Sequence, residues 1–267
     1  MARPGSRENA LEELPQTTLR WLSGWWRIIL FGAQLLVLTL SPSSYKRDSR
    51  GAMTRHLYLD TAPTLPWFTV LSALISLVII RIVLVTSISY GLSQYALEMV
   101  VRVLVLELIP LAAAVFAALR CTIPNAAELV ALRARGGFDV LRESGAEPLV
   151  FEVLPRVAAG VFATLMLVAV SCVVTLLLAY VSVYGFIVGG FDNYTHTVGR
   201  VFDSSVALIF VLKAFLLSLA VAVLPIASVL YDGPRVRTRT SAEIQSLLRV
   251  FSMILLIEAA ALVGNYY

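Results

Sequence analysis

Six charged residues stand inside stretches that are otherwise apolar enough to cross a membrane. They are Arg81, Glu98, Arg102, Glu107, Lys213 and Glu258. A charge at the centre of a bilayer costs roughly 3 kcal/mol on insertion scales unless it is paired or hydrated. Charges in such places either join helices as ion pairs or line a path along which a polar head group moves. The sequence leaves both roles open.

The spacing of these charges predicts their partners. Glu98 and Arg102 are four residues apart, so they share one face of a helix. Counted in residues from the outer ends of neighbouring apolar stretches, Arg81 and Glu107 lie at a similar depth. Lys213 and Glu258 also match each other in depth. We therefore expect ion pairs inside the membrane.

The composition excludes a soluble domain. Hydrophobic residues make up 59% of the 267 residues, and charged residues only 14%. A soluble core of that size needs a charged shell, whereas lipid accepts apolar side chains on the outside. Continuous apolar runs predict helices, because the strands of a membrane barrel would alternate. The net charge of +4 does not indicate nucleic-acid binding, since the basic residues sit at the ends of the apolar runs.

We predict an all-α integral membrane protein with five transmembrane helices. The apolar stretches cover about residues 65–90, 95–119, 157–183, 206–230 and 244–264. Before them, residues 19–40 are rich in tryptophan, and only thirteen uncharged residues follow Arg27, fewer than the roughly twenty that span a bilayer. This favours a helix lying in the membrane plane, with a true first span as the alternative. The chain thus divides into an N-terminal region, 1–64, and a five-helix membrane domain, 65–267.

The distribution of basic residues predicts the orientation. Lysine and arginine crowd the N-terminal region, the insert at residues 120–156 and the loop at residues 231–240. The two other loops and the C-terminus contain only Arg200 among them. By the positive-inside rule, the basic segments are cytosolic and the C-terminus is outside.

The polar insert at residues 120–156 has the composition of a cytosolic contact surface. Pro124 favours a helix start, residues 126–135 favour helix, and Gly136-Gly137 end it. We predict a short helix across the membrane surface, of the kind that couples a membrane subunit to an ATPase, with a solvated loop as the alternative. Its expected polar contacts are Glu128, Arg133 and Arg135, and its expected apolar contacts are Leu129 and Leu132.

The remaining reactive residues do not form a catalytic or metal-binding pattern. No phosphate-binding G-x-x-x-x-G-K-[ST] loop occurs, so the chain does not hydrolyse ATP by that route, and energy must come from a partner. Cys121 and Cys172 lie far apart, with only His56 and His196 as possible co-ligands. We expect packing thiols, with no disulfide, metal or directly bound cofactor.

The insert and the span before it resemble the MlaE/YrbE family of permeases, the membrane subunits of ABC-type lipid transporters that work with MCE-domain proteins. The matching residues are Glu107-Leu108, Pro110, Arg120, Ala127-Glu128-Leu129, Asp139, Leu141, Gly145, Pro148 and Pro155-Arg156, in register without a gap. The chain departs from the family pattern at Leu106, Ile109 and Gly136-Gly137. It thus looks like a divergent member.

The resemblance implies a permease of a bacterial-type inner membrane that moves lipid, by default phospholipid, without enzymatic activity of its own. It implies an ATP-binding cytosolic ATPase at the insert, with Asp139 in the contact, an MCE-domain protein outside, and a second permease copy or a paralogue. Two other readings stay open: an ion-coupled secondary transporter that uses the buried carboxylates, and a membrane scaffold. The first favours broken helices and repeats, which the sequence does not show, and a scaffold has no use for a coupling insert.

Overall fold

The computed structural model describes residues 30–34, 54–58, 60–143, 145, 147–186, 188–231 and 239–266. In this described part, all regular structure is helical. The in-plane helix expected at residues 19–40 lies outside the described residues, apart from a helical stretch at 30–34. Within that stretch, Phe31 is buried in the core.

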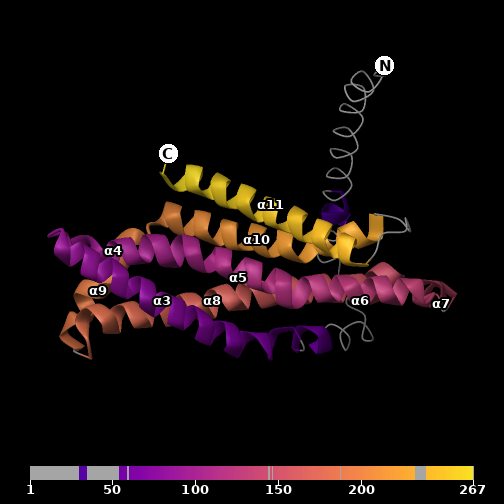
Figure 1. Ribbon diagram of the computed structural model, residues 1–267, viewed down its shortest axis with the longest axis horizontal. Coiled ribbons are helices and arrows are strands. Elements are labelled where there is room, and N and C mark those ends of the chain that lie inside the picture. The colour runs from indigo at the N-terminus through magenta and orange to yellow at the C-terminus, as the bar shows by residue number, and fades with distance from the viewer. Residues whose placement is uncertain are drawn as a thin grey trace, which may run out of the picture.

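Five helices of the described part are long and apolar enough to cross a membrane, which confirms the predicted fold class (Figure 1). They cover Thr64–Ser89, Ser93–Ala134, Leu149–Tyr184, Ser204–Ser228 and Ser246–Asn265. The first is α3 (Thr64–Ser89), the third is mostly α8 (Leu154–Tyr184), the fourth lies in α10 (Ser204–Tyr231) and the fifth in α11 (Arg239–Tyr266). Helices suit these apolar runs because each backbone group finds its partner within its own segment.

The second span consists of helical segments that follow one another without a break, from Ser93 to Ala134. After η2 (Ser93–Tyr95) they are α4 (Ala96–Val100), the π-helical η3 (Val101–Leu108), α5 (Ile109–Ala117), the π-helical η4 (Ala118–Thr122) and α6 (Ile123–Ala134). We call this stretch the rod. At roughly 1.5 Å per residue its 42 residues extend about 60 Å, twice the roughly 30 Å of the hydrocarbon layer. A large part of the rod therefore stands outside the membrane.

Prolines explain the wide π turns. Pro110, Pro124 and Pro155 each follow, by two residues, the end of a π-helical segment: η3, η4 and η5 (Leu149–Val153). Proline lacks an N–H, and its ring clashes with the carbonyl four residues earlier, so it kinks or ends an ordinary α-helix. A π turn is wider because its hydrogen bonds reach one residue further. The chain thereby passes each proline and stays helical.

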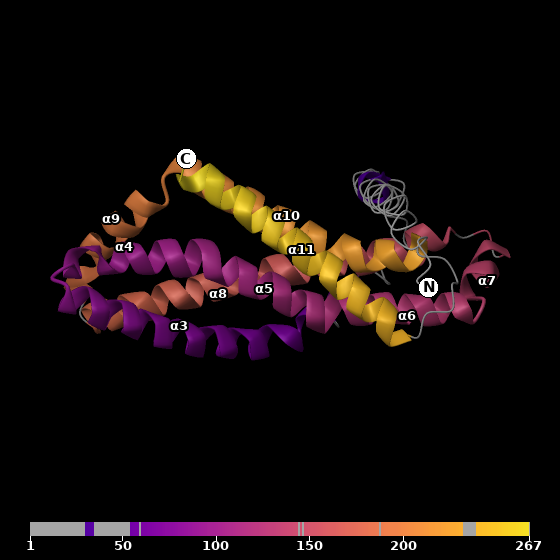
Figure 2. The ribbon, with the colours of Figure 1, turned by 45° about the horizontal axis from the view of Figure 1, so that its top comes forward.

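The helix of the insert runs in a different direction from the one predicted. The helix expected across the membrane surface is α6, and it continues the rod in line with α5 (Figures 1 and 2). Pro124 does not begin a separate helix, because η4 accommodates it. The chain turns only at Gly136, whose φ of +75° lies in the region that favours glycine. It then forms α7 (Gly137–Glu143) at the end of the rod.

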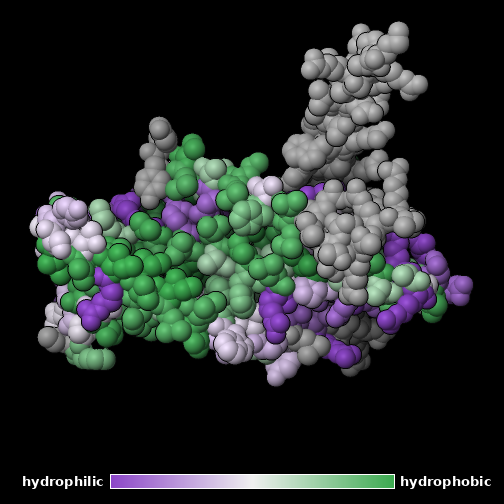
Figure 3. Space-filling view, in the orientation of Figure 1, coloured by the Kyte–Doolittle hydropathy of each residue, from purple (hydrophilic) through white to green (hydrophobic). Residues whose placement is uncertain are grey.

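The other spans pack around the rod through small side chains. α3 packs along α8, and α10 contacts both α8 and α11 (Figure 2). A Cβ added to Gly160 of α8 would lie 2.9 Å from Thr122 Cγ2 and 3.2 Å from Ala222 Cβ, so these helices meet only because glycine is there. Figure 3 shows an apolar surface over the middle of the molecule, with hydrophilic residues at the α6 and α7 end and also at the opposite end. This surface fits a lipid environment.

The segment before α10 contains a helix that the sequence analysis treated as a loop. This helix, α9 (Phe191–Val201), buries Tyr194, whose hydroxyl donates to the Leu176 carbonyl at 2.8 Å. The Tyr194 ring also meets Tyr180 edge-on, with centroids 5.1 Å apart. The signal was present, because residues 191, 194, 198 and 201 are apolar or aromatic at helical spacing.

Candidate functional site

Three charges from three helices meet inside the membrane-spanning part. Lys213 comes from α10, Glu107 from η3 and Glu258 from α11, and we call these residues the charge cluster. The Lys213 ammonium lies 2.8 Å from Glu258 Oε1, pairs with the Glu107 carboxylate, and donates to the Leu106 carbonyl at 3.1 Å. Its side chain is only 1% exposed. A buried ammonium is tolerated here because these oxygens replace its lost water.

The charge cluster confirms one predicted pair and corrects another. Lys213 and Glu258 pair as predicted. Glu107 was expected to pair with Arg81, but it pairs with Lys213 instead. Arg81 is exposed on α3 and makes no ion pair within the described residues. Matching depth places two residues at one level, but it does not determine the direction in which each side chain points around its helix axis.

The predicted pair of Glu98 and Arg102 is also formed. Arg102 Nη2 lies 3.0 Å from Glu98 Oε1, four residues away on the same helix. Both side chains are partly exposed. Such a pair within one helix contributes only about 0.2–0.5 kcal/mol and joins no two spans.

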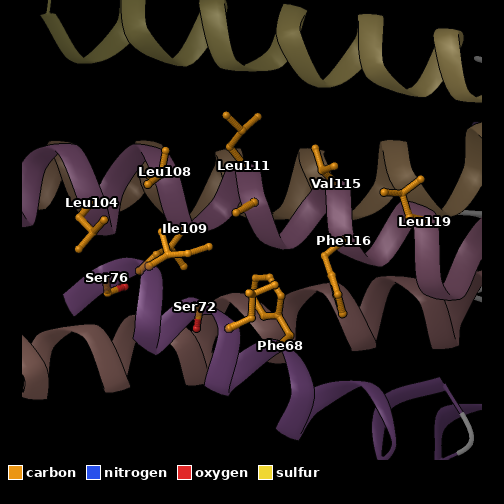
Figure 4. A pocket seen from close by; sticks show the side chains of 13 residues that line it. Phe68, Ser72, Ser76, Leu104, Leu108, Ile109, Leu111, Val115, Phe116 and Leu119 are labelled. Carbon is orange, nitrogen blue, oxygen red and sulfur yellow. The ribbon is translucent and has the colours of Figure 1, made fainter. Parts of the chain in front are cut away.

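A cavity of about 350 Å³ lies between α3 and the rod (Figure 4). Thirteen side chains line it, five from α3 and eight from the rod between Leu104 and Leu119. Phe68 and Phe116 face each other across this boundary, with ring centroids 4.8 Å apart. The volume falls within the roughly 300–1,000 Å³ of small-molecule sites. None of the thirteen is charged, so the six charged residues considered for a lipid path are not among them.

The cavity's two serines are already bonded to α8. Ser72 Oγ donates to Ser171 Oγ at 3.1 Å, and Ser76 Oγ and Thr175 Oγ1 lie 2.9 Å apart. These bonds join α3 to α8 and leave the cavity without a free hydroxyl from either serine. The arrangement therefore offers binding to an apolar chain. The sequence analysis missed these residues, although their matching four-residue spacing on the two helices was a signal.

A polar contact joins the start of α6 to the segment before α3. Asn125 Nδ2 donates to Asp60 Oδ2 at 2.7 Å, and Cys121 Sγ donates to the Asp60 carbonyl at 3.6 Å. Burial raises the pKa of the Asp60 carboxyl, although the bond from Asn125 opposes this. Burial, followed by the charge of Arg156, lowers the pKa of His56 nearby. These contacts fix the rod to the first span near the point where it leaves the apolar region.

The residues expected to contact an ATPase fall into two groups. Glu128, Arg133, Arg135 and Asp139 are exposed. Leu129 is 0% exposed and packs in the core of the chain, so the contact expected for it is wrong. The spacing in α6 revealed an apolar face, but it did not reveal that α10 of the same chain covers α6. Leu132 is half-buried and packs over Gly137.

Arg133 and two exposed valines lie at the α6 and α7 end of the rod. Arg133 Nη1 donates to the Leu230 carbonyl at 3.1 Å, and this carbonyl belongs to the last turn of α10, where acceptors lack helical partners. Arg133 therefore caps the end of α10 within the same chain. Val130 and Val140 are 46% and 65% exposed, so the apolar contacts available to a partner are these valines, which the sequence analysis did not identify.

Comparison with known proteins identifies the family. No curated protein matches the chain. The family model described as Permease MlaE matches residues 53–263, a range that includes the rod, the cavity and the charge cluster, and the chain therefore belongs to this family.

Proposed function

We propose that this chain is the permease subunit of an ATP-driven lipid transporter, with phospholipid as its substrate. The observation that carries the proposal is the cavity between α3 and the rod, where about 350 Å³ are lined by apolar side chains and the two serine hydroxyls are bonded to α8. An acyl chain fills such a space without leaving a polar group unsatisfied. Membership of the Permease MlaE family supports the same function.

The proposal assigns the other steps to partners. A cytosolic ATPase binds and hydrolyses ATP, and this chain carries no cofactor of its own. A second copy of the chain, or a paralogue, completes the permease in the inner membrane. An MCE-domain protein exchanges lipid with it on the outer side. The α6 and α7 end faces the cytosol in this arrangement, in line with the basic residues around it.

The rod supplies a route by which the ATPase acts on the cavity. Leu119 lines the cavity, and α6 begins at Ile123 with no break in the helix between them. A displacement of α6 and α7 therefore moves one wall of the cavity instead of being absorbed in a loop. Each ATP cycle would thereby squeeze the cavity against α3 and release the acyl chain.

A charge placed at Val140 should disrupt the docking of the ATPase. Val140 is 65% exposed on α7, so Val140→Glu leaves the fold intact but puts a carboxylate into an apolar contact. We expect binding of the cognate ATPase to the purified, reconstituted chain to weaken by at least about tenfold, since loss of a central contact costs more than about 1 kcal/mol. Phe186→Glu, in the turn that follows α8, is the matched control, since Phe186 is also exposed. Equal binding by both variants would rule out docking at α7.

Cysteine labelling tests the orientation. Cys121 and Cys172 are both buried and are first replaced by alanine. In that background, Thr195→Cys on α9 should react with an impermeant thiol reagent added to intact cells, because Thr195 is exposed. Asp139→Cys on α7 should react only after the cells are opened. The reverse pattern would invert the proposed topology.

A further inference from the structure

The hydrogen bonds of the charge cluster are unevenly shared. An ammonium group has three N–H donors. Those of Lys213 are accounted for by Glu107 Oε2, Glu258 Oε1 and the Leu106 carbonyl. Glu107 Oε1 has only the Asn265 amide at 3.4 Å, and Glu258 Oε2 is buried with no donor within the described residues. Each glutamate therefore has one poorly satisfied oxygen.

The charges of the cluster do not balance if every group is ionised. Two carboxylates and one ammonium leave a net charge of −1 in the membrane interior, where an uncompensated charge costs several kcal/mol. Glu258 is only 9% exposed, so water does not screen this charge. Both carboxyl groups accept from the same Lys213 ammonium, so they lie close to each other. Carboxylates at such a separation cannot both remain ionised without strong repulsion.

We propose that Glu107 and Glu258 hold one proton between them, in a carboxyl–carboxylate hydrogen bond beside the Lys213 ammonium. The proton supplies the missing donor and makes the cluster electrically neutral. It belongs to the pair and to neither residue alone.

Within the described residues, the ion pairs of the cluster involve no further charge. Lys213 pairs there with Glu107 and Glu258 and with no other group. α5, which packs against both η3 and α11, has no titratable side chain. On the rod itself, Arg102 is occupied by Glu98. Cys172 of α8 reaches η3, where its Sγ donates to the Val105 carbonyl at 3.9 Å.

The bound proton changes the nature of the contact between α11 and η3. With both carboxylates ionised, the two helices would repel each other across the cluster. With one proton they attract each other through a charge-assisted hydrogen bond. The proton therefore fastens the last span to the rod. This inference does not depend on lipid being the substrate.

Infrared spectroscopy of the full chain in phospholipid nanodiscs tests the proposal. Glutamate labelled with carbon-13 at the side-chain carboxyl separates its bands from those of aspartate. We expect the C=O stretch of one protonated glutamic acid per chain at neutral pH, shifted to lower frequency in heavy water. A wild-type spectrum without this band would overturn the proposal, and this outcome requires no variant.

Variants locate the proton. Glu107→Gln and Glu258→Gln should each abolish the band, because the remaining carboxylate becomes the sole counter-ion of Lys213 and has no reason to be protonated. Glu98→Gln should leave it unchanged, since Glu98 already pairs with Arg102. If a glutamine variant does not fold, Glu258→Asp keeps the acid but changes its geometry, and the band should shift. A band that survives in either glutamine variant, or that Glu258→Asp leaves unmoved, refutes sharing.

Discussion

Replacing Lys213 with methionine should destabilise the folded chain by about 3–5 kcal/mol, the range for removing one partner of a buried ion pair. Lys213 is the common partner of Glu107 and Glu258, so the change leaves two carboxyl groups with no cation beside them. Methionine has a similar length and fills much the same space, which keeps the loss of packing small. The loss should appear as a lower midpoint in thermal unfolding of the detergent-solubilised protein.

Neutralising the glutamates should reverse this loss in steps. If Lys213 paired with Glu258 alone, adding Glu258→Gln to Lys213→Met would restore stability. Because Glu107 is a third member, we expect that double variant to recover only partly, and the triple variant with Glu107→Gln to recover most of the loss. Arg102→Met is the matched control and should cost far less, since its pair is partly exposed and lies within one helix. Strictly additive losses would show that the three residues do not act as a unit.

Filling the cavity should stop lipid transfer without unfolding the chain. Ala112 lines the cavity, four residues after Leu108 and four before Phe116, so Ala112→Phe places a ring into the space that we assign to an acyl chain. Overpacking a full core costs about 1–3 kcal/mol, but a cavity of about 350 Å³ accepts the ring with less strain. We expect the transfer rate of a fluorescent phospholipid in proteoliposomes with the cognate partners to fall by at least tenfold, or about 1.4 kcal/mol.

The control for this variant is Leu74→Phe. Leu74 is on α3 but is exposed on the outer surface, so the added ring meets the bilayer and not the cavity. Its transfer rate should equal that of the wild type. Wild-type transfer by Ala112→Phe, with an unchanged unfolding midpoint, would remove this cavity from the lipid path. Equal losses in both variants would indicate a general effect of bulk on α3 and the rod.

The features that depend on composition and length were predictable from the sequence. Five apolar runs of sufficient length predict five spans, because lipid permits few other structures. Equal depth in neighbouring spans also predicted Glu258 of α11 as a partner of Lys213. Equal depth gave the wrong partner for Arg81, because the rotation of a helix about its axis depends on neighbours that are themselves apolar on all sides. Leu129 was misjudged for a related reason, since an apolar face on α6 looks the same whether it meets α10 or another protein.

The continuity of the rod could not be predicted from the sequence either. Pro124 and the charges that follow it are typical of a helix start after a break. A proline either breaks a helix or is accommodated by a π turn before it. The outcome depends on which carbonyl accepts the hydrogen bond of each preceding N–H group. Hydropathy contains no information on that choice. The cavity escaped prediction as well, because Ser72 and Ser76 look like ordinary polar positions until Ser171 and Thr175 are placed opposite them.

The π turns also set the angular phase of the two ends of the rod. A π bulge takes up about one residue more than an α turn, and one residue corresponds to on the order of 100° about the helix axis. η4 lies between Phe116, which lines the cavity, and α6, so the face that carries Glu128 is turned relative to the face that carries Phe116 compared with an unbroken α-helix. A shift of η4 back to α-helical bonding would rotate α6 relative to Phe116 and would carry Leu119 of the cavity wall with it. A change in hydrogen-bond register within η4 would thereby act on α6 as a torque.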